Sequence, residues 1–238
     1  MFNLSGTQQL KLHDGSSINY ELIKRNRRTI SLKITPKGLV VSAPILMTNY
    51  KINQLLQKKS KWIQKKILLT SYNEDPFEIQ NGVKFKILDK ELVVALKAGV
   101  NDISIKGSQC FISFKNLSDH PKLKKFFLIW IKIYALKYFT ERVENLCKKN
   151  NLKVQATLIS NAKTRWGTCN TRKEIRLNWR LIQSPQYVID YVICHELSHL
   201  KFMNHSSDFW QQVQLLFPNY KKAEMYLKEN GFKLHRIG

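Results

Sequence analysis

Two histidines and a glutamate stand at the spacing of a metal-binding helix. The segment runs Cys194-His195-Glu196-Leu197-Ser198-His199, and residues i and i+4 of an α-helix lie on one face about one turn apart. The imidazoles of His195 and His199 can therefore bind one ion, and the Glu196 carboxylate can take a proton from a water that the ion activates. The pattern predicts a zinc-dependent hydrolase with Glu196 as general base.

A catalytic zinc site needs a third protein ligand, and two residues are candidates. His205 follows His199 by six positions, and Glu224 lies further along the chain. His205 can reach the ion only if the helix ends soon after His199, because six residues along an unbroken helix turn a side chain by about 240°. Asn204, which tolerates left-handed backbone, and Ser206, a good N-cap, predict that break. We therefore predict His205 as the third ligand, with Glu224 as the alternative.

The elements that position these residues follow from hydrophobic periodicity. A helix is predicted from Pro185 to about Met203, with Ser184 as its N-cap. Before it, residues 174–181 alternate apolar and polar side chains, as does a strand with one face against the metal helix. A strand that lines the cleft can hold an extended peptide by edge pairing. The polar residues that we predict to steady an oxyanion there are Arg165, Asn178 and Arg180.

The chain before residue 120 is predicted to be rich in strands. A meander of three strands is expected at residues 18–23, 29–34 and 39–41. A hairpin is expected at residues 83–87 and 92–96, followed by two further strands at 102–106 and 110–114. Between them, Thr48 or Asn49 caps a helix to about Thr70, and a long helix follows at 121–150. We therefore predict an α+β protein with a β-rich basic region at 1–118 and a metal-binding region at 119–238.

The chain is strongly basic, with a formal net charge of +23 over 238 residues. Residues 1–70 carry thirteen Lys or Arg against two acids, and Arg25, Arg27 and Arg28 crowd into one turn. Such a surface attracts nucleic acid or another polyanion. The alternative is a compositional excess of lysine on solvated faces, since Lys outnumbers Arg by 31 to 9.

Cysteine usage and hydropathy bear on the compartment. The four cysteines form no Cys-x-x-Cys pair, which is typical of reduced thiols and predicts a cytoplasmic protein. No secretory signal is expected, because residues 1–9 lack a basic stretch followed by an apolar run. The most apolar helix, residues 126–136, is interrupted by Lys132 and is too short to span a bilayer, so no membrane span is predicted.

Three blocks of the sequence resemble the YgjP-like metallopeptidase family, which is related to the SprT-like and WLM zinc peptidases. The blocks are residues 28–32 with 38–44, residues 165–169 with 177–181, and residues 195–200 with 204–206 and 209–210. The resemblance covers nearly the whole chain. It implies a zincin-like region, helical with a small sheet, in which His195, His199 and His205 bind Zn²⁺ and Glu196 is the base.

The interpretation that unites these features is a zinc-dependent metallohydrolase that cleaves peptide bonds in a peptide or protein substrate. Two other classes stay open. A metal-dependent hydrolase of nucleotides or other phosphate esters is favoured by the charge. A non-catalytic nucleic-acid-associated protein would use zinc only for structure, but structural zinc is normally closed by four protein ligands, so three histidines beside Glu196 favour an enzyme.

Overall fold

A computed structural model of the chain describes residues 4–12, 15–35, 38–64, 66–67 and 77–238. The chain divides into two compact units, Met1–Pro76 and Phe77–Gly238. Each unit combines sheet and helix around its own hydrophobic core, which confirms the predicted mixed α+β class. The predicted turn at Pro36 and Lys37 and the predicted helix end at 68–70 lie outside the described residues.

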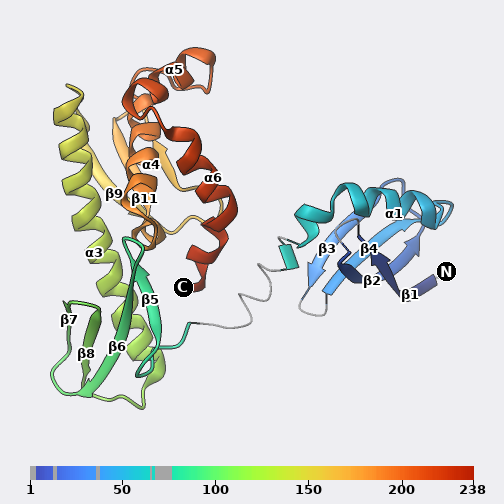
Figure 1. Cartoon of the computed structure of the whole chain (residues 1–238), viewed down its shortest axis with the longest axis horizontal. Helices are drawn as coiled ribbons and strands as arrows, with labels where there is room; N and C mark the ends of the chain where they lie inside the picture. Colours follow the sequence, from blue (N-terminus) through green and yellow to red (C-terminus); the bar gives the residue numbers. More distant parts are fainter. Residues whose placement is uncertain (1–3, 13–14, 36–37, 65, 68–76) are drawn as a thin grey trace. The chain divides into compact units, whose positions relative to one another are not determined.

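The first unit is a four-stranded sheet with one face covered by a helix (Figure 1). Its elements are β1 (Leu4–Lys11), β2 (Ser17–Arg25), β3 (Ser31–Thr35), β4 (Gly38–Pro44) and α1 (Asn49–Lys58). Alternate side chains of β2 and β4 are buried with Ile52 and Leu56 of α1. Thr48 caps the helix, as predicted, by accepting a hydrogen bond from the backbone NH of Lys51.

The predicted meander in this unit is wrong. The strand order is β1-β2-β4-β3, so β2 pairs in parallel with β4, and β3 lies outside as the antiparallel partner of β4. Alternation of apolar residues shows which residues form strands, but it does not show which strands pair. Strand β1 was not predicted, because its sequence has few apolar residues and it pairs with β2 through its backbone.

The second unit begins with another four-stranded sheet and a long helix. Its elements are β5 (Lys84–Ile87), β6 (Lys90–Ala98), β7 (Asp102–Lys106), β8 (Gln109–Phe114) and α3 (His120–Lys149). The predicted hairpin is confirmed, with Leu88 and Asp89 at positive φ in the turn between β5 and β6. The order β5-β6-β8-β7 repeats the pairing of the first sheet, including the central parallel pair.

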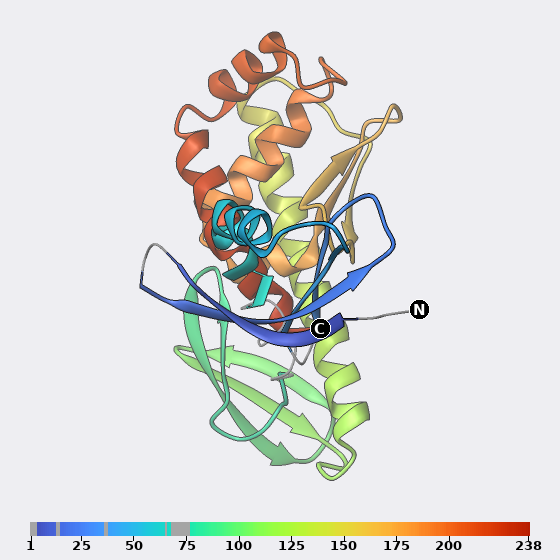
Figure 2. The same ribbon diagram turned by 90° about the vertical axis from the view of Figure 1, so that its right-hand side faces the viewer.

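The division between the units lies at Pro76 and Phe77, not after residue 118 as predicted. The cause is α3, whose Phe127 ring packs 5.7 Å from the ring of Phe77 and 5.2 Å from that of Phe85. The β5–β8 sheet lies at one end of this helix, and the remaining elements of the second unit lie along its other end (Figures 1 and 2). The sheet therefore shares one core with the metal-binding region.

The rest of the unit surrounds the predicted metal helix. Its elements are β9 (Ala156–Ser160), β10 (Gly167–Cys169), β11 (Glu174–Asn178), the 3-10 helix η1 (Trp179–Gln183), α4 (Gln186–Ser198), α5 (Ser207–Leu216), α6 (Tyr220–Asn230) and the 3-10 helix η2 (Gly231–Arg236). The three strands form a small sheet in the order β10-β11-β9, which leaves β10 at an edge. The predicted strand at 174–181 ends early, because residues 179–183 form η1.

Across the described ranges, no helix is both long enough and apolar enough to cross a lipid bilayer.

Candidate metal centre

Helix α4 carries His195, has His199 as its C-cap residue, and is buried on nearly every side. It begins after Pro185 without a side-chain cap, since the Ser184 hydroxyl donates instead to the Leu181 carbonyl at 2.6 Å. It ends at Ser198 rather than near Met203. The early end matters, because it allows the chain beyond it to return to the same face.

The return of the chain places His205 beside the first two histidines. One nitrogen from each of His195, His199 and His205 lies within 4.8 Å of the others, and the Nε2 atoms of His195 and His205 are 3.1 Å apart. The bend is made by turns after α4, where the Phe202 NH donates to the Ser198 carbonyl at 3.0 Å.

The predicted role of Asn204 is wrong and that of the following serine is confirmed. Among the described residues, the non-glycine positions with positive φ do not include Asn204, so no left-handed cap is needed. Ser206 accepts a hydrogen bond from the Phe209 NH at 3.4 Å and caps α5. The start of α5 therefore fixes the segment that carries His205.

Neighbouring groups orient the imidazoles and favour their neutral, unprotonated form. His199 Nδ1 lies 2.9 Å from the Phe202 carbonyl oxygen, so Nδ1 donates and Nε2 is left to bind a metal. The Phe209 ring packs within 5 Å of all three imidazoles, at 4.9, 4.5 and 4.7 Å between ring centres. Burial lowers the pKa of His195 to about 4 and also lowers that of His199. Neutral imidazole is the form that binds metals.

The carboxylate of Glu196 is enclosed without a hydrogen-bonding partner. The residue is 3% exposed, and its Oε2 atom is buried with no donor in reach among the described residues. Burial raises the pKa of Glu196 to about 8. A side chain at Gly167 would place its Cβ 2.7 Å from Cγ and 2.8 Å from Cδ of Glu196. Strand β10 thus needs glycine there to let the carboxylate lie against its backbone.

A cavity of about 570 Å³ opens over this group. One wall is residues 165–169, which include β10, and another is the face of α4 that carries Tyr191 and His195. Helix α6 contributes Glu224 and Leu227. Glu224 lies on the wall but outside the three-histidine group, so the geometry favours His205 as third ligand. Burial raises the pKa of Tyr191, and the Glu224 charge adds to the shift.

Of the three predicted oxyanion residues, only Arg165 lines the cavity. The Asn178 side chain is fully buried and donates to the carbonyls of Ala162 and Arg165 at 2.7 and 3.1 Å. The Arg180 guanidinium donates to the Gly238 carbonyl. Both predictions assumed a continuous strand with one solvent face, but the strand ends at Asn178 and both side chains brace the fold instead.

Two residues of the Arg-Trp-Gly-Thr-Cys block, Trp166 and Gly167, position the wall, and neither role was predicted from the sequence. The backbone of Gly167 admits Glu196, as described above. The Trp166 ring packs so closely on Gly231 that a Cβ there would lie 2.8 Å from its Cζ2 atom, and it lies 5.4 Å from the His235 ring. The glycine in this block is the signal that the sequence offers, because glycine marks positions where another group approaches the backbone closely.

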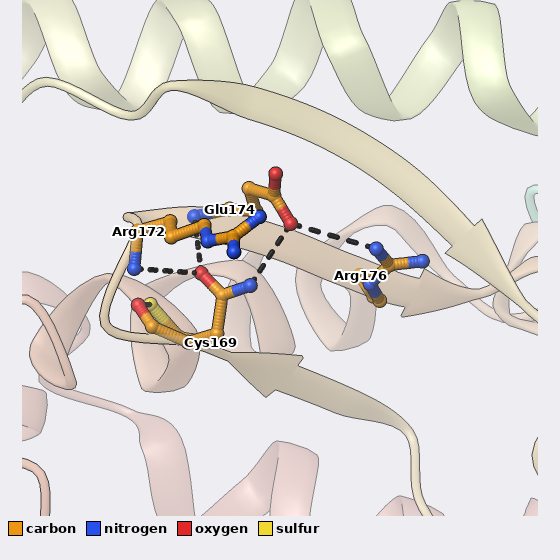
Figure 3. Close-up of polar contacts among 5 residues, drawn as sticks. Cys169, Arg172, Glu174 and Arg176 are labelled. Atoms are coloured by element: carbon orange, nitrogen blue, oxygen red, sulfur yellow. Dashed lines mark hydrogen bonds and ion pairs between the residues drawn. The ribbon is translucent and has the colours of Figure 1, made fainter.

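The turn after β10 is held by a polar network (Figure 3). The Asn170 Oδ1 atom accepts from the backbone NH groups of Arg172 and Glu174, both at 3.0 Å. Its amide donates to the Glu174 carboxylate at 2.9 Å, which also faces Arg176 at 3.5 Å. These contacts fix the hairpin of β10 and β11, so the cavity wall has a rigid edge.

Comparisons with known proteins place this site in a family. Two metallopeptidase zymogens of known structure, abylysin from Pyrococcus abyssi and jannalysin from Methanocaldococcus jannaschii, are 21% and 20% identical to the chain. The matches cover 38% and 39% of this chain and 93% and 95% of theirs, each with a TM-score of 0.35. No curated protein matches. The YgjP-like metallopeptidase domain matches residues 28–230, and the chain therefore belongs to that family.

Proposed function

We propose that this metallopeptidase is a zinc-dependent peptidase in which His195, His199 and His205 hold the metal and Glu196 is the general base. The observation that carries the proposal is the meeting of three imidazoles with a buried, unpartnered carboxylate in one cavity. Buried polar groups without partners are rare, and they mark places where a ligand supplies the missing contact.

The donor set fits zinc. Two nitrogens bound at about 2.0–2.1 Å to one tetrahedral ion are about 3.3 Å apart, and the Nε2 atoms of His195 and His205 are 3.1 Å apart. Three imidazoles suit zinc better than magnesium or calcium, which prefer oxygen ligands. When bound, zinc acts as a Lewis acid on a carbonyl oxygen and acidifies water.

The chain's own groups handle the proton and the peptide. Glu196 lines the cavity beside the three histidines with its Oε2 atom buried and unpartnered, so its carboxylate can take a proton from water and return it to the leaving amine. The outer edge of β10 has no strand partner in the described part of the chain. An extended peptide can add to this edge as a further strand, with Arg165 on the same wall as a donor to the developing oxyanion.

The test combines metal analysis with a digest of a peptide library. The wild-type protein is expected to contain about one zinc per chain and to cleave peptides, with no release of phosphate from nucleotides. Glu196→Gln should keep the zinc and lose turnover, whereas His195→Ala should lose the zinc. Turnover by the Gln variant would refute the role of Glu196, and hydrolysis of phosphate esters alone would refute the peptidase.

The identity of the third ligand needs a separate pair of variants. His205→Ala should release the zinc, because its nitrogen belongs to the compact group. Glu224→Ala should retain it, because Glu224 lies outside that group. The opposite result would make the Glu224 carboxylate of α6 the third ligand. Metal binding would then no longer explain why His195 and His205 lie so close together.

A further inference from the structure

We propose that Glu224 and the cavity wall around it form a subsite for a lysine or arginine side chain that flanks the scissile bond. The inference rests on the proposed peptidase function and adds a substrate class to it. Beyond the three histidines and Glu196, the acidic and basic groups that line the cavity among the described residues are Arg165 and Glu224. The wall of α6 is therefore where a cation can be recognised.

Glu224 has no structural task that explains its place. It is exposed and forms no hydrogen bond or ion pair within the described ranges of the chain. The chain has 40 basic residues against 17 acidic ones, so partners for a surface acid are abundant. A carboxylate that faces a cavity without one of them is available to a ligand.

The surroundings of Glu224 match the shape of a long basic side chain. Leu227 lies one turn further along α6, and Tyr191 and Val192 contribute apolar surface from α4. Lysine and arginine bury an aliphatic stem along apolar surface while the charged end reaches a polar partner. An apolar wall with a carboxylate at its margin is complementary to both halves of such a side chain.

Glu224 and the three histidines line the same cavity. Tyr191 precedes His195 by one helical turn, and their ring centres are 6.0 Å apart. One turn rises about 5.4 Å, which is also about the reach of a lysine side chain. Tyr191, which lines the cavity together with Glu224, is therefore within reach of a lysine side chain whose backbone carbonyl lies at the histidines.

The net charge of the chain opposes the approach of basic substrates. A chain with a net charge of +23 repels cationic peptides over long range. A local carboxylate inside the cavity, where solvent is partly excluded, offsets this repulsion only at the subsite. The preference of the cavity can thus be opposite to that of the surface.

The experiment measures kcat/KM on peptides capped at both ends, with lysine, norleucine or glutamate next to the scissile bond. Wild type should prefer lysine to norleucine by about tenfold, the ratio that one charge-assisted contact gives. Glu224→Gln should bring the ratio near one, and Glu224→Lys should favour glutamate. Glu229→Gln, on the same helix but away from the cavity, is the matched control and should behave as wild type.

A binding measurement separates recognition from turnover. In the background of Glu196→Gln, calorimetry with the lysine peptide should show a Kd about tenfold weaker once Glu224→Gln is added, with zinc content unchanged. An unchanged lysine preference in Glu224→Gln overturns the subsite. A parallel series of the same peptides with free amino termini is the control, and dependence on Glu224 that is seen only in that series overturns its assignment to a side chain. Failure of the wild type to cleave any peptide refutes the peptidase itself and is distinguishable from both.

Discussion

Replacing Gly167 with alanine tests whether strand β10 positions the general base. The new Cβ would lie 2.7 Å from Cγ and 2.8 Å from Cδ of Glu196, whereas non-bonded carbons prefer about 3.5–4.0 Å. The Glu196 carboxylate must therefore move by about 1 Å. Displacement of a catalytic group by that distance lowers the rate about 100-fold, so we expect a loss of that size in kcat.

The same substitution should change folding and metal binding little. Gly167 does not have a positive φ, so alanine is compatible with its backbone, and the atoms that must move belong to one side chain. Overpacking of this kind costs about 1–2 kcal/mol in the free energy of unfolding. Zinc content should stay at the wild-type value, because the three histidines are not among the closest neighbours of the new methyl group.

The assay compares kcat, zinc content and urea unfolding of Gly167→Ala with those of Gly6→Ala. Gly6 lies in strand β1 and also lacks positive φ, and a methyl group added there would meet no described atom within 4 Å. The control should retain full activity. Full activity in Gly167→Ala would refute the positioning of Glu196 by β10, and loss of zinc would show that the damage spreads beyond the base.

Three further predictions concern stability and binding. Arg142 donates to both carboxylate oxygens of Asp190 at 2.9 and 2.8 Å, so Asp190→Asn should cost about 2–3 kcal/mol in urea unfolding; a change below about 0.5 kcal/mol would contradict a structural role for the pair. Ser206→Ala removes the N-cap of α5 and should cost about 1 kcal/mol, and zinc titration should show weaker binding because the neighbouring His205 is less well held; unchanged affinity would contradict this. Arg25 and Arg28 are exposed, and replacing both with serine should lower the salt slope of oligonucleotide binding by about 0.7–0.9 for each lost phosphate contact; no binding at low salt would leave the basic charge as solvated surface.

The structure decides which arginines should be replaced in the test of polyanion binding. The sequence placed Arg25, Arg27 and Arg28 in one basic turn, but the Arg27 guanidinium donates to the Ser31 hydroxyl at 3.0 Å and is half-buried. Replacing it would disturb the start of β3 as well as the charge. The double variant that keeps Arg27 is therefore the cleaner test of polyanion binding.

The meeting of the three histidines could be predicted from the sequence because its signals are local. The i, i+4 spacing of His195 and His199 fixes their relation on a helix, and Ser206 marks the start of the next helix within a few residues. The approach of Gly167 to Glu196 could not be predicted in this way. It depends on the distance between a strand and a helix that are far apart in the sequence, and single-sequence patterns do not report such distances.

The predicted end of the strand before α4 failed for a physical reason. Alternation continues through residues 174–181, but Asn178 accepts a hydrogen bond from the Arg180 NH and turns the chain into η1. Asparagine often offers the backbone such a partner in place of the sheet. The polar side chain of Arg180 is then buried and donates hydrogen bonds to the distant Gly238 carbonyl. The alternating pattern predicted that this side chain would face solvent.

Helix α3 explains why a division at residue 118 looks reasonable in the sequence and is absent in the fold. Both four-stranded sheets have the same strand order and are each followed by a helix, but α1 has 10 residues and α3 has 30. The first turns of α3 cover the β5–β8 sheet through Leu123 and Phe127.

The later turns of α3 reach the metal-binding part of the same unit. They contact β9. Arg142 of α3 also forms an ion pair with Asp190 of α4, five residues before His195. A helix of 30 residues is about 45 Å long, far more than one small sheet needs. Its extra length makes the β5–β8 sheet part of the scaffold of α4, so we infer that damage to that sheet's core reaches the three histidines through α3.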